Sequence, residues 1–147
     1  MTTPSTDRHN FGQLVLSVAR LWRRAADKVL DDYGLSHATA MPLVTLSRLG
    51  DNVRQGVIAD HLGLEGPSLV RVIDLLLAEG LVSRIEDPSD RRAKILSLTE
   101  SGRQRAAEIE HILGALRTDL LAEFDNAQFQ AAEALLTRLE TRLLDRS

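Results

Sequence analysis

The chain has 147 residues, 44% of them hydrophobic and 3% aromatic, and carries a net charge of −3 at pH 7. This length and apolar content predict one domain with a buried core. The sequence contains no cysteine and its four histidines are scattered, so we expect no disulfide, no thiol chemistry, no metal site and no cofactor. Because the net charge is negative, binding to a polyanion would depend on where individual cations are placed.

Residues 1–10 are polar and lack the apolar stretch of a signal peptide, and no segment approaches the roughly 18 apolar residues of a membrane span. We therefore expect a cytoplasmic protein without membrane contact. Few aromatic residues and many Leu, Ala, Arg and Glu residues favour a mainly α-helical fold over a β-sandwich.

The first third of the chain predicts two helices. Apolar residues recur with helical spacing over residues 11–33, and Gly34 is a natural stop. Ser36 is a favourable N-cap for a second helix that reaches residues 49–50. Pro42 lies inside this helix and is expected to kink it or make it irregular.

Residues 54–80 have the pattern of a helix-turn-helix. A short amphipathic segment at residues 54–62 is closed by Gly63, and Pro67 is a favourable first residue for a helix over residues 67–80. Helical spacing predicts the buried face of this second helix: Leu69, Val70, Ile73, Leu76 and Leu77.

A charged β-hairpin, the wing, is predicted over residues 84–98. Residues 81–85 and 93–98 have strand character, and the turn between them contains the sequence Asp-Pro-Ser-Asp at residues 87–90. The predicted fold class is therefore mainly α with a small β-hairpin: a winged helix-turn-helix lobe at residues 36–99 within a single unit of residues 1–147.

The C-terminal third predicts two more helices. Thr99 and Ser101 offer N-caps for a helix to about residue 123, and residues 126–144 form the last one. Their apolar faces exceed what the central lobe can cover, so we expect residues 11–33 and 100–146 to form an intertwined homodimer. The alternative is intramolecular packing of the first helix on the last two.

The exposed face of the helix at residues 67–80 begins with Ser68, Arg71 and Val72. The N-terminal end of a recognition helix meets base edges in the major groove, where an arginine can bridge guanine O6 and N7. Arg71 is therefore the leading candidate for base recognition. The alternative is a surface arginine paired with Asp74 or Glu65.

The wing supplies further candidate DNA contacts. Arg91 and Arg92 are expected to enter the minor groove, with Asp90 orienting Arg92 through a carboxylate–guanidinium bond. Three more residues are assigned to phosphates: Arg84 and Lys94 on the strands, and Gln55 at the start of the short helix. The alternatives are a solvated charged turn for the wing and a plain helix cap for Gln55.

Two blocks of sequence carry a family resemblance. Residues 65–82 (EGPSLVRVIDLLLAEGLV) and 87–102, which include DPSDRRAK, resemble the MarR family of bacterial transcriptional regulators, and within it the SlyA branch. The resemblance implies a homodimer that binds a pseudo-palindromic operator in double-stranded DNA, often as a repressor released by a small aromatic or acidic effector. It also implies that the helix matching residues 67–80 enters the major groove and the arginine matching Arg92 enters the minor groove.

The same resemblance implies an effector crevice lined by the first two helices. Arg20 and Arg23 on the first helix are candidates to receive a carboxylate, and Ala40 and Val44 on the second would line the crevice. Ala40 stands where relatives often have a bulky aromatic residue, which would leave a larger space. The alternative is that the arginines are solvated.

The sequence also bears on two other classes of function. An enzyme would need a catalytic constellation or a phosphate-binding loop, and the sequence has neither, so we expect no enzymatic activity. A winged helix used for protein–protein contact stays open, because basic residues are not in excess.

Overall fold

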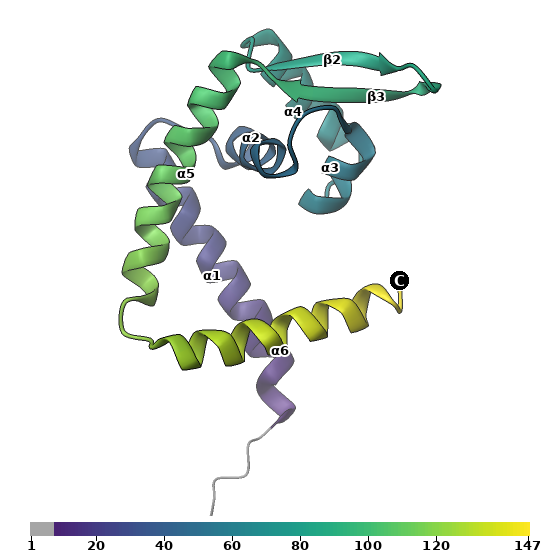
Figure 1. Cartoon of the computed structure of the whole chain (residues 1–147). Coiled ribbons are helices and arrows are strands. Elements are labelled where there is room, and N and C mark those ends of the chain that lie inside the picture. Colours follow the sequence, from purple (N-terminus) through teal and green to yellow (C-terminus); the bar gives the residue numbers. More distant parts are fainter. Residues whose placement is uncertain (1–7) are drawn as a thin grey trace, which may run out of the picture. The chain divides into compact units, whose positions relative to one another are not determined.

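The computed structural model describes residues 8–147, so most of the polar segment 1–10 lies outside the description. The chain forms two compact units, Met1–Gly114 and Ala115–Ser147. In chain order (Figure 1) the elements are the 3-10 helix η1 (Arg8–Asn10), α1 (Phe11–Asp32), α2 (His37–Leu49), β1 (Val53–Arg54), α3 (Gln55–Leu62), α4 (Gly66–Ala78), β2 (Val82–Asp87), β3 (Asp90–Leu98), α5 (Glu100–Leu121) and α6 (Asn126–Leu144).

The predicted winged helix-turn-helix fold is confirmed, with one correction to its sheet. The strand β1 pairs antiparallel with β3, which gives a three-stranded sheet of order β1-β3-β2 in place of an isolated hairpin. Arg54 therefore ends a strand and serves as the N-cap residue of α3, although it was expected to begin the helix. A strand of two residues is too short to show the alternation by which strands are recognised in a sequence.

One hydrophobic core holds the helix-turn-helix and the wing together. Its largest fully buried side chains come from α1 to α5 and from the middle strand: Leu30, Leu43, Leu46, Ile58, Ile73, Leu76, Leu96 and Ile109. Pro42 is also buried, and α2 continues as an α-helix through it. Because α3 and α4 are too short to be stable alone, their orientation depends on this shared core.

The buried face of α4 is narrower than predicted. Leu69, Ile73 and Leu76 are buried as expected, but Val70 is exposed and Leu77 only half-buried. Residues 69, 73 and 76 form a single stripe on a helix, and residues 70 and 77 lie together on one side of it. The helix also begins at Gly66 and ends at Ala78, within two residues of the predicted bounds.

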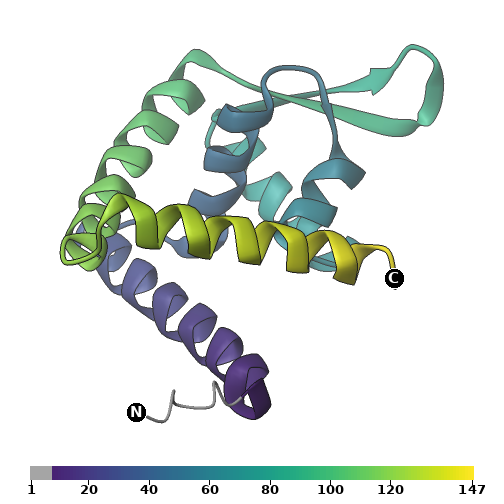
Figure 2. The ribbon, with the colours of Figure 1, turned by 60° about the horizontal axis from the view of Figure 1, so that its bottom comes forward.

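The wing is a hairpin of β2 and β3, whose pairs run from Val82 with Leu98 to Asp87 with Asp90. Both strands extend further toward the turn than predicted, and the register shifts between Glu86 and Asp87. The hairpin projects beyond α3, with its turn at the free end (Figure 2). The backbone of the turn therefore lies at the end of the hairpin away from α5.

Thr99 and Gly102 fix the start of α5 against the base of the wing. The Thr99 hydroxyl donates to the Gly80 carbonyl (2.6 Å) and accepts from the Gly102 amide (3.0 Å), which confirms Thr99 as an N-cap. A Cβ atom added to Gly102 would lie only 1.9 Å from the Leu81 carbonyl oxygen. Glycine at position 102 therefore permits the close approach of α5 to the wing.

The second unit contains the end of α5 and the predicted last helix, α6. A capping box begins α6: the Asp125 carboxylate accepts from the Gln128 amide (2.8 Å), and the Gln128 side chain accepts from the Asp125 amide (2.9 Å). Phe124 and Phe129 contact edge to face with their ring centroids 6.4 Å apart.

Both α1 and α6 leave apolar side chains exposed. On α1 these are Phe11, Leu14, Leu16, Val18, Leu21 and Trp22, and on α6 they are Leu135, Leu136, Leu143 and Leu144. Only Ala26 and Leu30 of α1 are buried, and no residue of α6 is. Within residues 8–147, none of the helices is long and apolar enough to cross a membrane.

Candidate nucleic-acid interface

The N-terminal end of α4 presents the first group of predicted DNA contacts. Ser68 and Arg71 are exposed and Val72 is half-buried. The alternative, in which Arg71 forms a surface ion pair with Asp74 or Glu65, is not found. Asp74 lies beside Arg84 (3.7 Å), and Arg71 has no ion pair within residues 8–147. The Arg71 guanidinium is therefore available to another molecule.

The same residues of α4 also line a cavity of about 500 Å³ in the first unit. Apolar side chains form much of its wall, with polar groups from α1, α2 and α3 added to those of α4: Arg23, His37, Ala38, Met41, Pro42, His61, Leu62, Leu64, Pro67, Ser68, Arg71 and Val72. An apolar wall with a few charged groups is typical of sites for small organic molecules. Of the four predicted effector contacts, only Arg23 reaches this cavity.

The other three predicted effector contacts lie elsewhere. Ala40 and Val44 are almost completely buried in the core, so neither contributes to the cavity wall. Arg20 is exposed and lines a shallow depression formed only by residues of η1 and α1. The family resemblance suggested that Arg20 and Arg23 receive one carboxylate, but the cavity wall includes only Arg23.

His37 is the residue of the cavity whose titration is perturbed. Burial lowers its pKa below the ordinary value of 6.5; Asp27 opposes this shift and Arg23 reinforces it. Its Nδ1 atom lies 2.6 Å from an Asp27 carboxylate oxygen, which joins the end of α1 to the start of α2. The lowered pKa favours the neutral form of His37, and the arginines of the cavity wall, Arg23 and Arg71, can pair with an anion.

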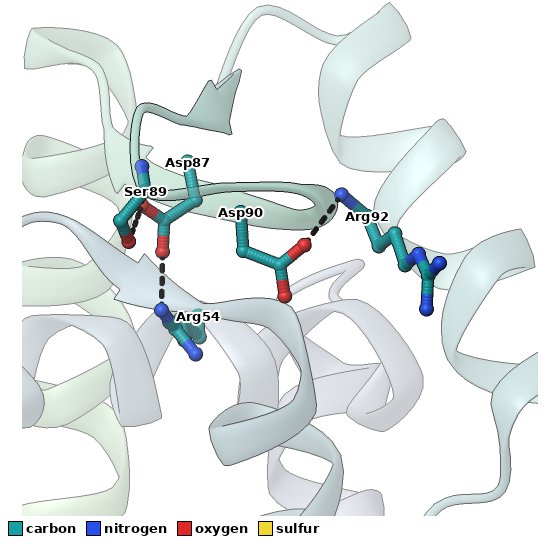
Figure 3. A network of polar contacts seen from close by, with 5 residues as sticks. All are labelled: Arg54, Asp87, Ser89, Asp90 and Arg92. Carbon is teal, nitrogen blue, oxygen red and sulfur yellow. Dashed lines mark hydrogen bonds and ion pairs between the residues drawn. The ribbon is translucent and has the colours of Figure 1, made fainter.

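The wing tip presents the second group of predicted contacts. Arg91 and Arg92 are exposed, and neither guanidinium has an ion-pair partner in the described part of the chain. The predicted bond between Asp90 and the Arg92 guanidinium is wrong. Asp90 accepts instead from the Arg92 backbone amide (3.0 Å; Figure 3), as in an Asx-turn, because the amide two residues along the chain lies closer than the end of a long side chain.

The cations on the wing strands are paired. Arg84 lies 3.7 Å from Asp74 of α4, and the Lys94 ammonium lies 3.2 Å from Glu86 on the facing strand. Both were predicted to contact phosphates. Each would have to share its charge between its carboxylate and DNA, so the two contribute less to DNA affinity than unpaired cations would.

A groove of about 600 Å³ separates the start of α3 from β3. It brings three predicted residues together, namely Gln55, Arg92 and Lys94, and adds Arg54. The Gln55 side-chain oxygen is buried without a hydrogen-bond partner, which argues against its being a plain helix cap. Of the three cations of the groove, Arg54 and Lys94 are paired with Asp87 and Glu86, so Arg92 and the N-terminal amides of α3 are the groups best placed to receive a phosphate.

A network around Asp87 was not predicted. Asp87 is the one charged residue that is buried among residues 8–147, with 6% of its surface exposed. Its carboxylate accepts from the Ser89 amide (2.9 Å) and hydroxyl (2.7 Å) and pairs with the Arg54 guanidinium at 2.6 Å (Figure 3). The Ser89 hydrogen bonds, followed by Arg54, hold the pKa of Asp87 below its ordinary value of 3.8.

No cluster of three or more His, Asp or Glu residues that could hold a metal ion occurs in the described part of the chain. The site consists instead of cations and hydrogen-bonding groups on a projecting helix end and a hairpin turn. Such groups bind and orient a polyanion, and they do not form the nucleophile, base and oxyanion arrangement of a hydrolytic enzyme.

Comparison with known proteins identifies the family of this chain. A model of the MarR family matches residues 33–93. Transcriptional regulator PA3341, known from its crystal structure, is 36% identical over 92% of this chain and 98% of its own, with a TM-score of 0.83. A MarR transcriptional regulator from Methanosarcina mazei Go1 is 23% identical over 95% of this chain and 100% of its own, with a TM-score of 0.81.

A further structural relative is a mutant of MarR from E. coli complexed with operator DNA. It is 22% identical over 91% of this chain and 99% of its own, with a TM-score of 0.75. At this identity the likeness concerns the fold. The names of PA3341 and of the Methanosarcina mazei protein describe transcriptional regulators and not enzymes. From the family match and from its 36% identity to a regulator along nearly the full length of both chains, this chain belongs to the MarR family of transcriptional regulators.

Proposed function

We propose that this protein is a sequence-specific regulator that binds double-stranded DNA. The observation that carries the proposal is that exposed arginines without an ion pair occur at two places on the winged helix-turn-helix. Arg71 lies at the start of α4, and Arg91 and Arg92 lie at the wing tip. An arginine without a protein partner keeps its full charge and hydrogen-bonding capacity for phosphates and base edges. The operator complex of the E. coli relative supports the same class of partner.

Two structural elements contact DNA, each in a different groove. The start of α4, with Ser68, Arg71 and Val72, enters the major groove, where Arg71 contacts a guanine. The wing enters the adjacent minor groove with Arg92, and the groove between α3 and β3 faces the phosphates between these contacts. Arg84 and Lys94 act as secondary phosphate contacts, since each already has a carboxylate neighbour.

The functional form is a homodimer built from the helices at the two ends of the chain, residues 11–33 and 100–146. The exposed apolar side chains of α1 and α6 support this assignment, because such surfaces are normally covered by a partner. A two-fold dimer also presents two copies of α4 to a pseudo-palindromic operator. Sedimentation equilibrium tests it, and a monomer at micromolar concentration would contradict it.

We further place the protein in the SlyA-like branch and assign it a repressor role that a small acidic, aromatic effector relieves. The cavity lined by Arg23 supports the effector assignment, because Arg71 and Ser68 line the same cavity. A carboxylate held between Arg23 and Arg71 would withdraw Arg71 from DNA. Binding of effector and of operator would then oppose each other by linkage.

The effector assignment is tested with salicylate as the probe. Salicylate should release the wild-type protein from DNA, and Arg23→Ala should bind DNA normally while requiring more salicylate for release. Arg20→Ala is the matched control, since Arg20 lies outside the cavity. Equal release of all three proteins would remove Arg23 from the site.

The main proposal is tested by selecting a binding site from random duplex DNA and measuring the affinity for that site and for a scrambled duplex. Specific regulators prefer their site by roughly 10³-fold or more at physiological salt. We expect a preference of that order. Equal affinity for both duplexes would contradict sequence-specific binding, and absence of binding to either would contradict the function as a whole.

A further inference from the structure

The ion pair between Arg54 and Asp87 joins the start of α3 to the turn of the wing. Arg54 ends β1 and is the N-cap residue of α3, whereas Asp87 ends β2 at the wing turn. The strand β3 lies between β1 and β2 in the sheet. The 2.6 Å contact between the two side chains therefore spans the middle strand and ties the wing turn to the start of α3.

A buried carboxylate at this place calls for an explanation. Removal of Asp87 from water is unfavourable, and a buried ion pair is weak evidence for added stability. An apolar residue at the end of β2 would avoid that cost. A hydrogen-bonded ion pair, unlike an apolar contact, fixes one defined geometry between the two elements that it joins.

The geometry fixed by this pair extends to the wing tip. Asp87 also holds Ser89 in the turn through two hydrogen bonds, and Asp90, which pairs with Asp87 in the hairpin, accepts from the Arg92 amide. Figure 3 shows two sets of short contacts, one joining Arg54, Asp87 and Ser89 and the other joining Asp90 to the Arg92 amide, and the backbone pairing of Asp87 with Asp90 links the two sets. The Arg92 side chain itself stays unpaired at the end of these contacts.

We propose that Arg54 and Asp87 are positioning residues for DNA recognition, which set where the wing tip lies relative to the helix-turn-helix. The pair fixes the distance between the contacts of α4 in one groove and those of Arg92 in the next. This inference rests on the proposed function, because it concerns the same DNA. It adds a role for two residues that touch each other across the sheet and act through Arg92.

Asp87→Asn separates positioning from simple electrostatics. The substitution removes a negative charge beside Arg54, and charge alone would strengthen DNA binding. Loss of positioning would instead weaken binding to the selected site, by roughly five- to tenfold. Glu86→Gln is the matched control, because it removes the same charge from the neighbouring residue of the same strand, where the side chain is exposed. We expect Glu86→Gln to bind as well as the wild type or better.

Footprinting with hydroxyl radicals, which attack DNA through the minor groove, tests whether the effect is local to the wing. With Asp87→Asn we expect protection under the wing to be lost while major-groove protection from methylation under α4 remains. A pair that only stabilised the fold would weaken both together and lower the thermal midpoint. Equal or tighter binding by Asp87→Asn, with the wing footprint intact, would overturn the inference.

The single variant Arg54→Gln keeps the inference testable if Asp87→Asn disturbs the turn, because it removes the ion pair and leaves both hydrogen bonds between Asp87 and Ser89 in place. The double variant Arg54→Gln/Asp87→Asn tests whether the two residues act together. Because the two residues act as one unit, the double variant should bind no more weakly than the weaker single variant. If the double variant instead loses affinity by the product of the two single-variant losses, the residues act independently and the inference is wrong. If the wild-type protein binds no DNA, the proposed function itself fails; if it binds and the variants match it, only the positioning role fails.

Discussion

The tip and the strands of the wing carry the same kind of side chain in opposite electrostatic settings. On the strands, Arg84 and Lys94 each lie beside a carboxylate, whereas Arg91 and Arg92 at the tip have no ion pair among residues 8–147. Since a paired cation already has part of its charge neutralised, the tip offers more affinity per cation. A chain with a net charge of −3 can thus present a cationic contact where it meets DNA.

The largest effect should come from the tip. Arg92→Ala is expected to weaken binding to the selected operator by about 1–3 kcal/mol, because it removes the arginine that we propose enters the minor groove. Arg84→Ala, at a paired position on the strand, should cost less than about 1 kcal/mol. Fluorescence anisotropy at fixed salt measures both. Equal losses would abolish the distinction between tip and strands.

The position of the wing depends on its attachment at the base. Gly102→Ala should lower the free energy of unfolding by about 1–3 kcal/mol, because the added methyl group meets the Leu81 carbonyl oxygen. The control is Gly56→Ala in α3, where nothing lies within 4 Å of the added atom and alanine favours the helix. Urea denaturation without DNA compares them. A Gly102→Ala protein as stable as the control would contradict the close packing.

Removal of the carboxylate beside Arg84 should make this strand arginine as available to DNA as the arginines of the tip. Asp74→Asn leaves Arg84 without its neighbour, and we expect DNA affinity to rise by about 0.2–1 kcal/mol. The slope of log affinity against log salt should become steeper by about one unit, because one more phosphate is neutralised. A salt titration of both proteins supplies the slope. If it stays the same, Arg84 does not reach DNA even when unpaired.

The smallest effect concerns the acid sensitivity of the wing turn. Because the Ser89 and Arg54 contacts hold the pKa of Asp87 below 3.8, the unfolded chain binds a proton at this residue more readily than the folded chain does. The stabilisation is complete above the ordinary pKa and is lost as the pH falls through 3.8 toward the folded value. Asp87→Asn should therefore lose less stability than the wild type below about pH 4. Parallel loss of stability in both proteins would contradict this.

Most of the fold follows from local patterns in the sequence. Residues 126–144 coincide with α6, and Thr99 caps α5, because helical spacing and capping residues act within one turn of the chain. The short strand β1 could not be predicted, since it exists only through its pairing with residues 95 and 96, some forty positions away. Arg54 was consequently given no role beyond the start of a helix.

The candidate site was predicted only in part, because local patterns do not show contacts between distant residues. Helix periodicity and turn signals in the sequence predict which side chains are exposed, and they do so correctly for Arg71, Arg91 and Arg92. The partners of Arg84, Asp87 and Asp90 depend on which side chains meet across the sheet. A buried aspartate in a turn rich in polar residues has no local signal that distinguishes it from a solvated one.

The most direct test of the two-element recognition is a salt titration of the wild type, Arg71→Ala and Arg92→Ala on the selected operator and on a scrambled duplex. We predict that Arg71→Ala loses mainly the preference for the operator, because it removes a base contact. Arg92→Ala should weaken binding to both duplexes and reduce the salt slope by about one unit. Affinities and slopes unchanged in both variants would contradict the assignment of DNA recognition to these arginines.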